Sequence, residues 1–177
     1  MISKNVAKAL NEQIMKEIYS AYLYQSMAAY SAGKNLKGFA NWFQVQALEE
    51  LYHAEKIYNY IFDQGEEVEL LGIDKPPKDF KSTKDLFEQT LTHEKKVTAS
   101  IKSIVDLAKK ENDDATYIFL QWFVTEQVEE EAVPAEILGR LGLVGEQGSG
   151  IFMMDSELGA RVYNPPVEKR YLKLFLP

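Results

Sequence analysis

Residues 46–56 read QALEELYHAEK and place an acid and a histidine three residues apart, Glu50 and His53, inside an apolar pattern. Ala47 precedes them and Ala54 and Ile57 follow them at helical spacing. Side chains three or four residues apart share one face of an α-helix. The stretch therefore predicts a helix that carries a carboxylate and an imidazole on the face that a helix normally buries.

The composition bounds the possible classes of protein. The chain has 177 residues, enough for one domain with a sizeable core, and a net charge of −7, which argues against nucleic acid as the main partner. It has no cysteine, so it forms neither disulfides nor thiolate metal sites. The N-terminal residues are charged and polar where a signal peptide is apolar, and no run is apolar enough to span a bilayer. We expect a cytoplasmic protein without membrane contact.

Glycine and proline are scarce and grouped, and they divide the chain clearly. Four uninterrupted runs with a 3.6-residue apolar stripe predict long helices over residues 5–32, 39–64, 83–111 and 113–140. Ser82 or Thr83 is the expected N-cap of the third helix. A short fifth helix is predicted over 151–162. We divide the chain into a bundle (1–145), a short C-terminal helix of the same domain (146–163) and a tail (164–177).

Connection lengths predict the topology. The first and second helices, and the third and fourth, are joined by only a few residues, which favours antiparallel neighbours. The connection between the second and third helices has no helical pattern, and its roughly 18 residues reach about 60 Å when extended. A helix of roughly 27 residues is only about 40 Å long. The sequence thus predicts an all-α four-helix bundle with one long crossover between its second and third helices.

Each predicted helix carries a polar residue of metal-ligand type near its middle, inside the apolar stripe. These residues are Glu17, Glu50 with His53, Glu94, and Gln127 with Glu130. In an aligned bundle the helix middles meet, so the six side chains form one layer. Buried carboxylates cost several kcal/mol each unless a charge compensates them, and the stripes hold no lysine or arginine beside them. Carboxylates with one imidazole suit a divalent transition metal, with iron a natural candidate.

Three stretches together resemble the ferritin family, specifically the non-haem ferritins of bacteria and archaea: LNEQIMKEIYSAYLY (10–24), QALEELYHAEK (46–56) and FLQWFVTEQVEEE (119–131). The resemblance extends to about Gly159. It implies a ferritin-like fold, oxidation of Fe(II) by O2 or H2O2, and storage of the product as a ferric oxyhydroxide mineral. It also implies a hollow homo-oligomeric shell of about 24 subunits in closed symmetry.

The resemblance assigns the ligands by position. It implies a first iron site at Glu17, Glu50 and His53, and a second at Glu94, Gln127 and Glu130, with Glu50 shared. A third site, facing the cavity, matches Glu49, Glu126, Glu129 and Glu130; spacing alone equally allows a solvated acidic face. Tyr24 matches an electron donor, or else is a half-buried core tyrosine. Trp122 likewise is a second donor or packing.

The same comparison excludes some relatives and leaves alternatives. Bacterioferritins and di-iron enzymes use two Glu-x-x-His motifs, whereas this chain has only His53 and His93, and we read His93 as structural or exposed. Leu51 stands where a haem-ligating methionine would stand, so no haem is expected. Two departures from the family pattern are Pro134, expected to kink its helix near Glu130, and the apolar tail, which either docks on a neighbour or is disordered. The alternatives are an interaction bundle whose acids are surface charge and a di-iron oxygenase.

Overall fold

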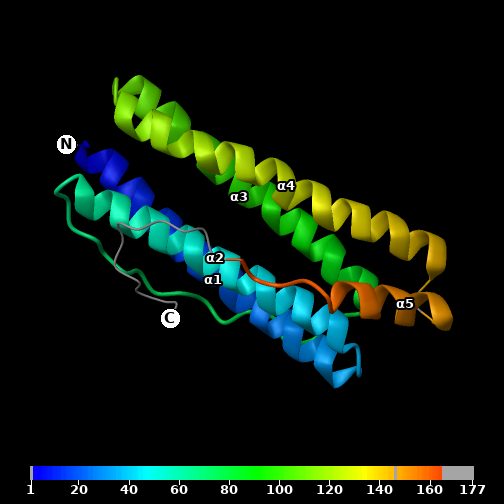
Figure 1. Ribbon diagram of the computed structural model, residues 1–177. Coiled ribbons are helices and arrows are strands. Elements are labelled where there is room, and N and C mark those ends of the chain that lie inside the picture. The colour runs from blue at the N-terminus through cyan, green and yellow to red at the C-terminus, as the bar shows by residue number, and fades with distance from the viewer. Residues whose placement is uncertain (1, 146, 165–177) are drawn as a thin grey trace.

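The computed structural model of the chain describes residues 2–145 and 147–164, which form five helices and no strand (Figure 1). The helices are α1 (Lys4–Gly33), α2 (Lys37–Asp63), α3 (Thr83–Lys110), α4 (Asp114–Val144) and α5 (Ser149–Leu158). Helix α1 packs along α2, and α3 packs along α4. The predicted all-α class and four-helix bundle are confirmed. The expected docking of the tail concerns residues that, from 165 onward, lie outside the described part of the chain.

Helices α1, α2 and α3 each end next to a residue in the left-handed backbone region. These residues are Asn35, Gly65 and Asn112, with φ of 61°, 74° and 56°. After each of them a backbone N–H reaches back to a carbonyl of the last helical turn. Glycine adopts this conformation freely, and asparagine tolerates it because its short polar side chain bonds locally. Glycine and proline alone are therefore incomplete signals for the ends of helices in this chain.

Two predicted boundaries were wrong. Helix α4 continues through Pro134 as far as Val144, four residues past the predicted end at Arg140, and α5 ends at Leu158 rather than at Val162. Pro134 is buried on the face that packs against the rest of the bundle. Packing of this face holds α4 helical beyond the proline, although the proline removes one backbone N–H and its ring crowds the carbonyl one turn earlier. At the start of α3 the predicted cap is Ser82, whose hydroxyl accepts from the backbone N–H of Asp85 at 3.2 Å.

The crossover between α2 and α3 has no regular structure and runs along the bundle, so that α2 and α3 begin at the same end (Figure 1). It is fixed to α1. The amide of Asn11 donates to the Glu67 carbonyl at 3.3 Å and accepts from the Glu69 N–H at 2.9 Å. Nearer the other end, the Ser26 hydroxyl donates to the Pro77 carbonyl at 2.5 Å. The predicted length-spanning crossover is confirmed.

The apolar core is divided into two clusters, one toward each end of the bundle. One contains Tyr24, Phe39, Phe43, Phe87 and Ile137 among others. The other contains Ile14, Ile57, Ile101, Leu120 and Phe123 among others. The predicted polar residues lie between these clusters in the sequence of every long helix. Apolar packing on both sides therefore holds the four helix middles in place around a polar layer.

Helix α5 docks on the N-terminus of α2. The first residues of α2 lack a local side-chain cap, and Asp155 of α5 supplies one: its Oδ1 accepts from the N–H groups of Gly38 at 2.8 Å and Phe39 at 3.0 Å. A carboxylate is favourable there because unpaired N–H groups and the helix dipole make a helix N-terminus positive. A Cβ on Gly38 would lie 1.5 Å from the Asp155 carbonyl oxygen, so only glycine permits this contact.

The described helices include none that is long and apolar enough to cross a membrane.

Candidate metal centre

The six ligand-type residues predicted inside the stripes are all buried, each at most 8% exposed. We call them the buried layer: Glu17 on α1, Glu50 and His53 on α2, Glu94 on α3, and Gln127 and Glu130 on α4. Each helix brings its residue inward because the stripe that packs against the two apolar clusters continues through that position. Four separate helices thus deliver polar side chains to one depth of the bundle.

The buried layer contains two groups of ligand atoms spaced for metal binding. In one group, atoms of Glu17, Glu50 and His53 lie within 4.8 Å of one another; in the other, atoms of Glu50, Glu94 and Glu130 do. Glu50 belongs to both groups, so one carboxylate can contact two ions at once. The groups bring together the residues that the sequence assigned to the first and second iron sites, apart from Gln127. The Gln127 amide instead donates to Glu94 Oε2 at 3.2 Å.

Burial and mutual repulsion favour the protonated form of these acids. Burial, followed by the neighbouring carboxylates, raises the pKa of Glu50 and of Glu130 well above its usual value. Burial, offset in part by hydrogen bonds from Tyr24 and Gln127, raises the pKa of Glu94 to about 7. Near neutral pH the layer can therefore exchange protons for cations with little change in its total charge.

Two carboxylate oxygens of the layer, Glu17 Oε2 and Glu50 Oε1, are buried without a hydrogen-bond partner. Each buried unpaired acceptor costs about 1–3 kcal/mol. Both belong to the ligand group that includes His53, whose Nδ1 lies 3.3 Å from Glu50 Oε2. Oxygen donors and one imidazole nitrogen suit Fe(II). The residues present therefore fit a divalent cation, which would satisfy the acceptors that the protein leaves open.

Two glutamines that the sequence reasoning missed orient two of the acids. Gln13 Nε2 donates to Glu17 Oε1 at 2.8 Å, and Gln46 Nε2 donates to Glu130 Oε2 at 2.5 Å. Gln13 precedes Glu17 by four residues, a spacing that places the two side chains side by side on a helix and could have revealed the pair. The contact of Gln46 joins α2 to α4, and no spacing within one helix indicates it.

The hydroxyl of Tyr24 donates to Glu94 Oε1 in the interior of the bundle. Tyr24 is fully buried, not half-buried, and burial together with Glu94 and Glu50 raises the pKa of its phenol well above the usual value. Its hydroxyl is satisfied and adjoins the second ligand group. The other aromatic residue singled out, Trp122, lies beside the layer, with its ring centroid 5.5 Å from that of His53.

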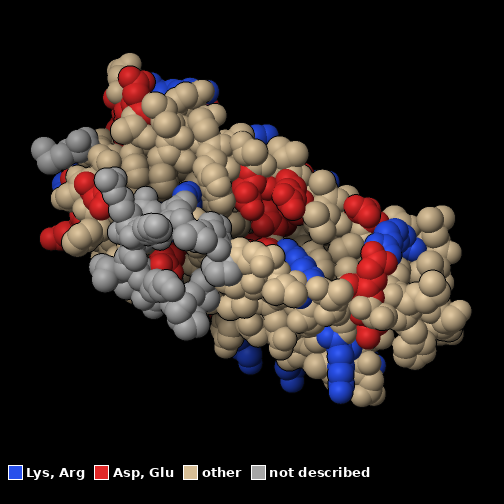
Figure 2. Space-filling model, in the orientation of Figure 1, with Lys and Arg blue, Asp and Glu red and all other residues tan. Residues whose placement is uncertain are grey.

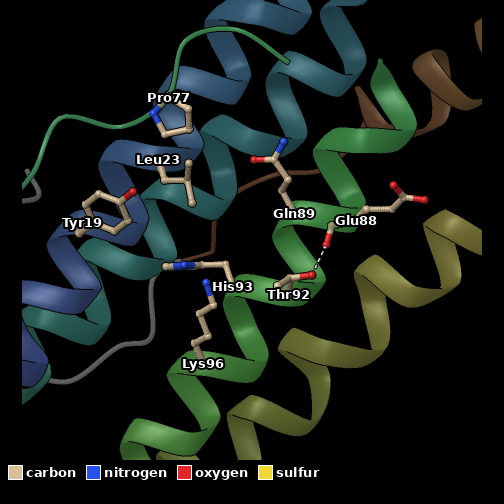
Figure 3. A pocket seen from close by; sticks show the side chains of 8 residues that line it. All are labelled: Tyr19, Leu23, Pro77, Glu88, Gln89, Thr92, His93 and Lys96. Carbon is tan, nitrogen blue, oxygen red and sulfur yellow. Dashed lines mark hydrogen bonds between the residues drawn. The ribbon is translucent and has the colours of Figure 1, made fainter. Parts of the chain in front are cut away.

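His93, next to Glu94 in sequence, points away from the layer. It lines a surface pocket of about 290 Å³ between α1, α3 and the crossover, together with Tyr19, Pro77 and Lys96 (Figure 3). The Oγ of Ser20 lies 2.7 Å from its Nε2. Burial, and then the charge of Lys96, lowers the pKa of His93 to about 4. The histidine is therefore neutral at physiological pH and lies outside both ligand groups of the layer.

The residues predicted for a third site line a small pocket beside the layer. This acidic pocket, of about 50 Å³, is lined by Gln46, Glu49, Glu126, Glu129, Glu130, Val133 and Arg161. Figure 2 shows acidic side chains gathered over α4 on this face, with a basic side chain close by. The ligand atoms spaced for a metal are those of His53, Glu126 and Glu130. Glu49 is instead paired with Arg161 at 2.5 Å.

Arg161 is a residue of this site that the sequence analysis did not predict. The apolar stripes of the four long helices hold no compensating charge, and Arg161 follows α5, outside every stripe. No periodic pattern links it to α2. It reaches the pocket because the segment after α5 folds back along α2, where the amide of Asn41 donates to the Arg161 carbonyl at 2.9 Å.

Comparisons with known proteins agree with this geometry. Residues 7–144 match the family model described as "Ferritin-like domain". The "Bacterial non-heme ferritin" of Staphylococcus aureus (strain USA300) is 39% identical over 164 residues, which cover 93% of this chain and 99% of that protein. The counterpart from Staphylococcus saprophyticus is 40% identical, with 93% and 98% coverage. A solved "open pore ferritin" from the hyperthermophilic archaeon Archaeoglobus fulgidus has a TM-score of 0.90 and 46% identity, covering 92% of this chain and all of that one.

The fold and the buried layer define a four-helix-bundle protein with a candidate metal site between its helices. The match over most of the chain goes further, and this chain belongs to the ferritin family, a family of iron-storage proteins.

Proposed function

We propose that this protein is a ferroxidase that stores iron: it binds Fe(II) in the buried layer, oxidises it with O2 or H2O2, and keeps the product as a ferric oxyhydroxide mineral. The observation that carries the proposal is the buried layer itself, with four glutamates, one histidine and two unpaired carboxylate oxygens between two apolar clusters. A bundle selected only for stability gains nothing from such a layer, because each buried carboxylate costs free energy.

The residues divide the work of binding. Glu17 and His53 hold one Fe(II), Glu94, Gln127 and Glu130 hold the other, and Glu50 contacts both. Binding displaces the protons that burial keeps on Glu50, Glu94 and Glu130. Gln127 takes part by turning its amide oxygen toward the ion that it would share with Glu94.

The oxidation balances with the groups at hand. Two Fe(II) ions give one electron each to O2, which takes up two protons and becomes H2O2. With H2O2 as the oxidant, two further Fe(II) ions and two protons give two molecules of water. Tyr24 is placed to supply one of these electrons in place of an Fe(II) ion, because oxidation of its phenol releases a proton and Glu94 Oε1 already accepts the hydrogen bond from that hydroxyl. The chain itself thereby links electron donation to a proton acceptor.

We propose that the acidic pocket, with Glu49, Glu126, Glu129 and Glu130, forms the third iron site. It adjoins the buried layer through the shared Glu130, and unlike the layer it reaches the surface. Iron that leaves the layer would meet these carboxylates next. The family's storage of a mineral requires such a route from an oxidation site to a cavity.

We propose further that the chain assembles into a closed shell of about 24 copies. Large apolar side chains stand exposed at the end of the molecule that carries α5, with Leu143 88% and Phe152 65% exposed. Exposed apolar groups that gather at one end of a chain commonly mark a contact with another chain. A related structure is named an open pore ferritin, and a pore presupposes an enclosed space.

Anaerobic titration with Fe(II), followed by aerobic loading and negative-stain imaging, tests the proposal. We expect tight binding of two irons per chain and, after loading, hollow particles with dense cores. The matched control is Glu136→Gln, which removes an exposed glutamate of α4 and should change neither result. An interaction bundle would bind no stoichiometric iron, and an oxygenase would bind iron without forming shells.

A further inference from the structure

Arg161 is seated on the acidic pocket by four separate contacts. Its Nη2 lies 2.5 Å from Glu49 Oε2, and its Nη1 donates to Gln46 Oε1 at 2.9 Å and to the Trp42 carbonyl at 3.3 Å. The guanidinium carbon lies 4.7 Å from the centroid of the Trp42 ring. The side chain is only 26% exposed. A planar guanidinium that donates hydrogen bonds from its N–H groups and also stacks on an aromatic ring is held in a specific position.

The guanidinium of Arg161 already pairs with a carboxylate that a metal cation in this pocket would need as a ligand. Glu49 Oε2 already accepts from Arg161, and a second cation on the same carboxylate would meet a positive charge within a few ångströms. The pocket has a volume of only about 50 Å³, so neither charge can be screened by many waters. Like charges at such a distance in a partly buried site repel each other, so the guanidinium weakens the binding of a metal ion there.

Arg161 also fixes the direction of the Gln46 amide. The oxygen of this amide accepts from Arg161, so its nitrogen faces Glu130 and donates to Oε2 at 2.5 Å. A primary amide has one accepting end and one donating end. While Arg161 is in place, Gln46 therefore ties Glu130 by a donated bond. Once Arg161 leaves, the amide can rotate and offer its oxygen to a cation, and Glu130 is released.

The segment that presents Arg161 is tied to α5 and to α2. The N–H groups of residues 159–161 donate to carbonyls in the last turn of α5 at 3.0–3.3 Å, and the Asn41 amide of α2 donates to the carbonyls of Gly159 at 3.4 Å and Arg161 at 2.9 Å. Asp155 caps α2 with two bonds at or below 3.0 Å. The backbone of the segment therefore stays with α5, and the Arg161 side chain releases the pocket by rotating away while α5 stays docked.

We propose that Arg161 is a built-in competitor for the cation of the acidic pocket: it occupies Glu49 and orients Gln46 until a metal ion displaces it. This inference rests on the proposed function only in that a cation enters the pocket. Because the coupling between two ligands is reciprocal, a bound metal ion loosens Arg161 as much as Arg161 weakens the metal ion. The buried layer, which has no such competitor among the described residues, then fills first, and the pocket accepts only the ions that follow.

Zn(II) is the probe, because it takes carboxylate and imidazole ligands without redox chemistry. The chain has two tryptophans, and Trp122→Phe leaves Trp42 as the only indole emitter. Zn(II) is titrated into the assembled apo-protein of this variant by calorimetry and by tryptophan fluorescence. We expect tight binding without a change in Trp42 emission, followed by a weaker phase in which the emission changes because the guanidinium leaves the ring.

Four substitutions test whether the charge and position of Arg161 control metal binding in the acidic pocket. Arg161→Gln should tighten the weak phase about tenfold, leave the tight phase unchanged and abolish the Trp42 response. Arg161→Lys, which keeps the charge, should lie closer to the parent protein. Asn41→Ala loosens the segment without removing any charge and should give an intermediate gain. Arg140→Gln is the matched control: it removes a half-buried arginine that pairs with Glu157 on α5 and should alter neither phase.

The outcomes distinguish the inference from the proposed function. If the weak phase of Arg161→Gln superimposes on that of the parent, or if saturation of the pocket in the Trp122→Phe protein leaves Trp42 emission unchanged, Arg161 is no competitor. The second measurement does not require any variant of Arg161 to fold. If the parent lacks the tight phase altogether, the buried layer binds no metal and the proposed function fails, whatever the pocket does.

Discussion

Two groups of glutamates meet at Glu130, one inside the bundle and one at its surface. In the buried layer, carboxylates face one another around a single imidazole, and burial raises the pKa of Glu50 well above its usual value. In the acidic pocket, burial also raises the pKa of Glu49, but Arg161 lowers it again in part. The layer thus holds protons in the absence of metal, whereas the pocket holds an arginine.

The difference shows two ways in which a protein can keep a metal site folded before metal binds. Protonated carboxylates suit a fully buried site, because protonation removes a negative charge that burial penalises. A basic side chain of the same chain suits a site at the surface, because its guanidinium can move out into solvent when a metal ion binds. The first kind of site responds to pH, and the second responds to the freedom of a chain segment.

The largest effect is expected for Glu50→Ala. This change removes a ligand and a charge from both ligand groups, and a loss of about 3 kcal/mol of transition-state stabilisation would slow Fe(II) oxidation roughly a hundredfold. The apo-protein should nonetheless melt no lower than the parent, within about 1–2 kcal/mol, because a buried carboxylate is removed. Stopped-flow oxidation and apo-protein melting curves measure the two quantities. Unchanged oxidation would show that Glu50 does not bridge, and unfolding would show that its role is structural.

His53→Ala should have a smaller effect than Glu50→Ala. Within the buried layer it takes a neutral ligand from one of the two ligand groups, so we expect slower oxidation and one weakened site with the other intact; it also removes an imidazole from the group of His53, Glu126 and Glu130 at the acidic pocket. Anaerobic Fe(II) titration counts the remaining tight sites per chain. His93→Ala is the natural control, since that histidine faces the pocket between α1 and α3. Loss of both tight sites in His53→Ala would mean that the histidine organises the whole layer.

The stability of the apo-protein should fall as pH rises from 6.5 to 8. The pKa of Glu94 is raised to about 7, so its contribution is fully present below the unfolded value near 4.5 and is lost as pH rises through 7. His93, with a pKa lowered to about 4, acts in the opposite direction but only below about pH 6.5, where the unfolded histidine titrates. The titration of Glu94 alone should lower the free energy of unfolding by about 1 kcal/mol between pH 6.5 and 8.

Melting of the metal-free protein at several pH values measures this slope. Glu94→Gln, which resembles the protonated acid in shape, should flatten it, and the exposed Glu136→Gln should leave it unchanged. A parent protein whose stability rises over the same window would contradict the raised pKa.

The smallest effect is expected for Glu129→Gln. Glu129 lies in the acidic pocket, is exposed and belongs to no ligand group among the described residues. The variant should keep two tight irons per chain but change the ratio of iron oxidised to O2 consumed, which an oxygen electrode measures. An unchanged ratio would remove Glu129 from the third site.

The helices and the layer could be predicted from the sequence because both depend on local periodicity. A repeat of 3.6 residues decides which side chains share a face, and Glu17, Glu50, Glu94 and Glu130 each lie on an apolar face at similar depth. The exact ends of α4 and α5 were harder, because packing across the bundle holds α4 together beyond Pro134.

The sequence by itself determined the four-helix bundle, its crossover and the six residues of the buried layer, because each follows from spacing within one helix and from the lengths of the connections. Only the tertiary structure decided how these residues are oriented and what occupies the surface beside them. Arg161 meets Glu49, 112 positions away in the chain, because Asp155 caps α2 and Asn41 holds the segment that follows α5. Contacts between elements so distant in sequence leave no periodic trace, since each depends on where two backbones happen to meet in space.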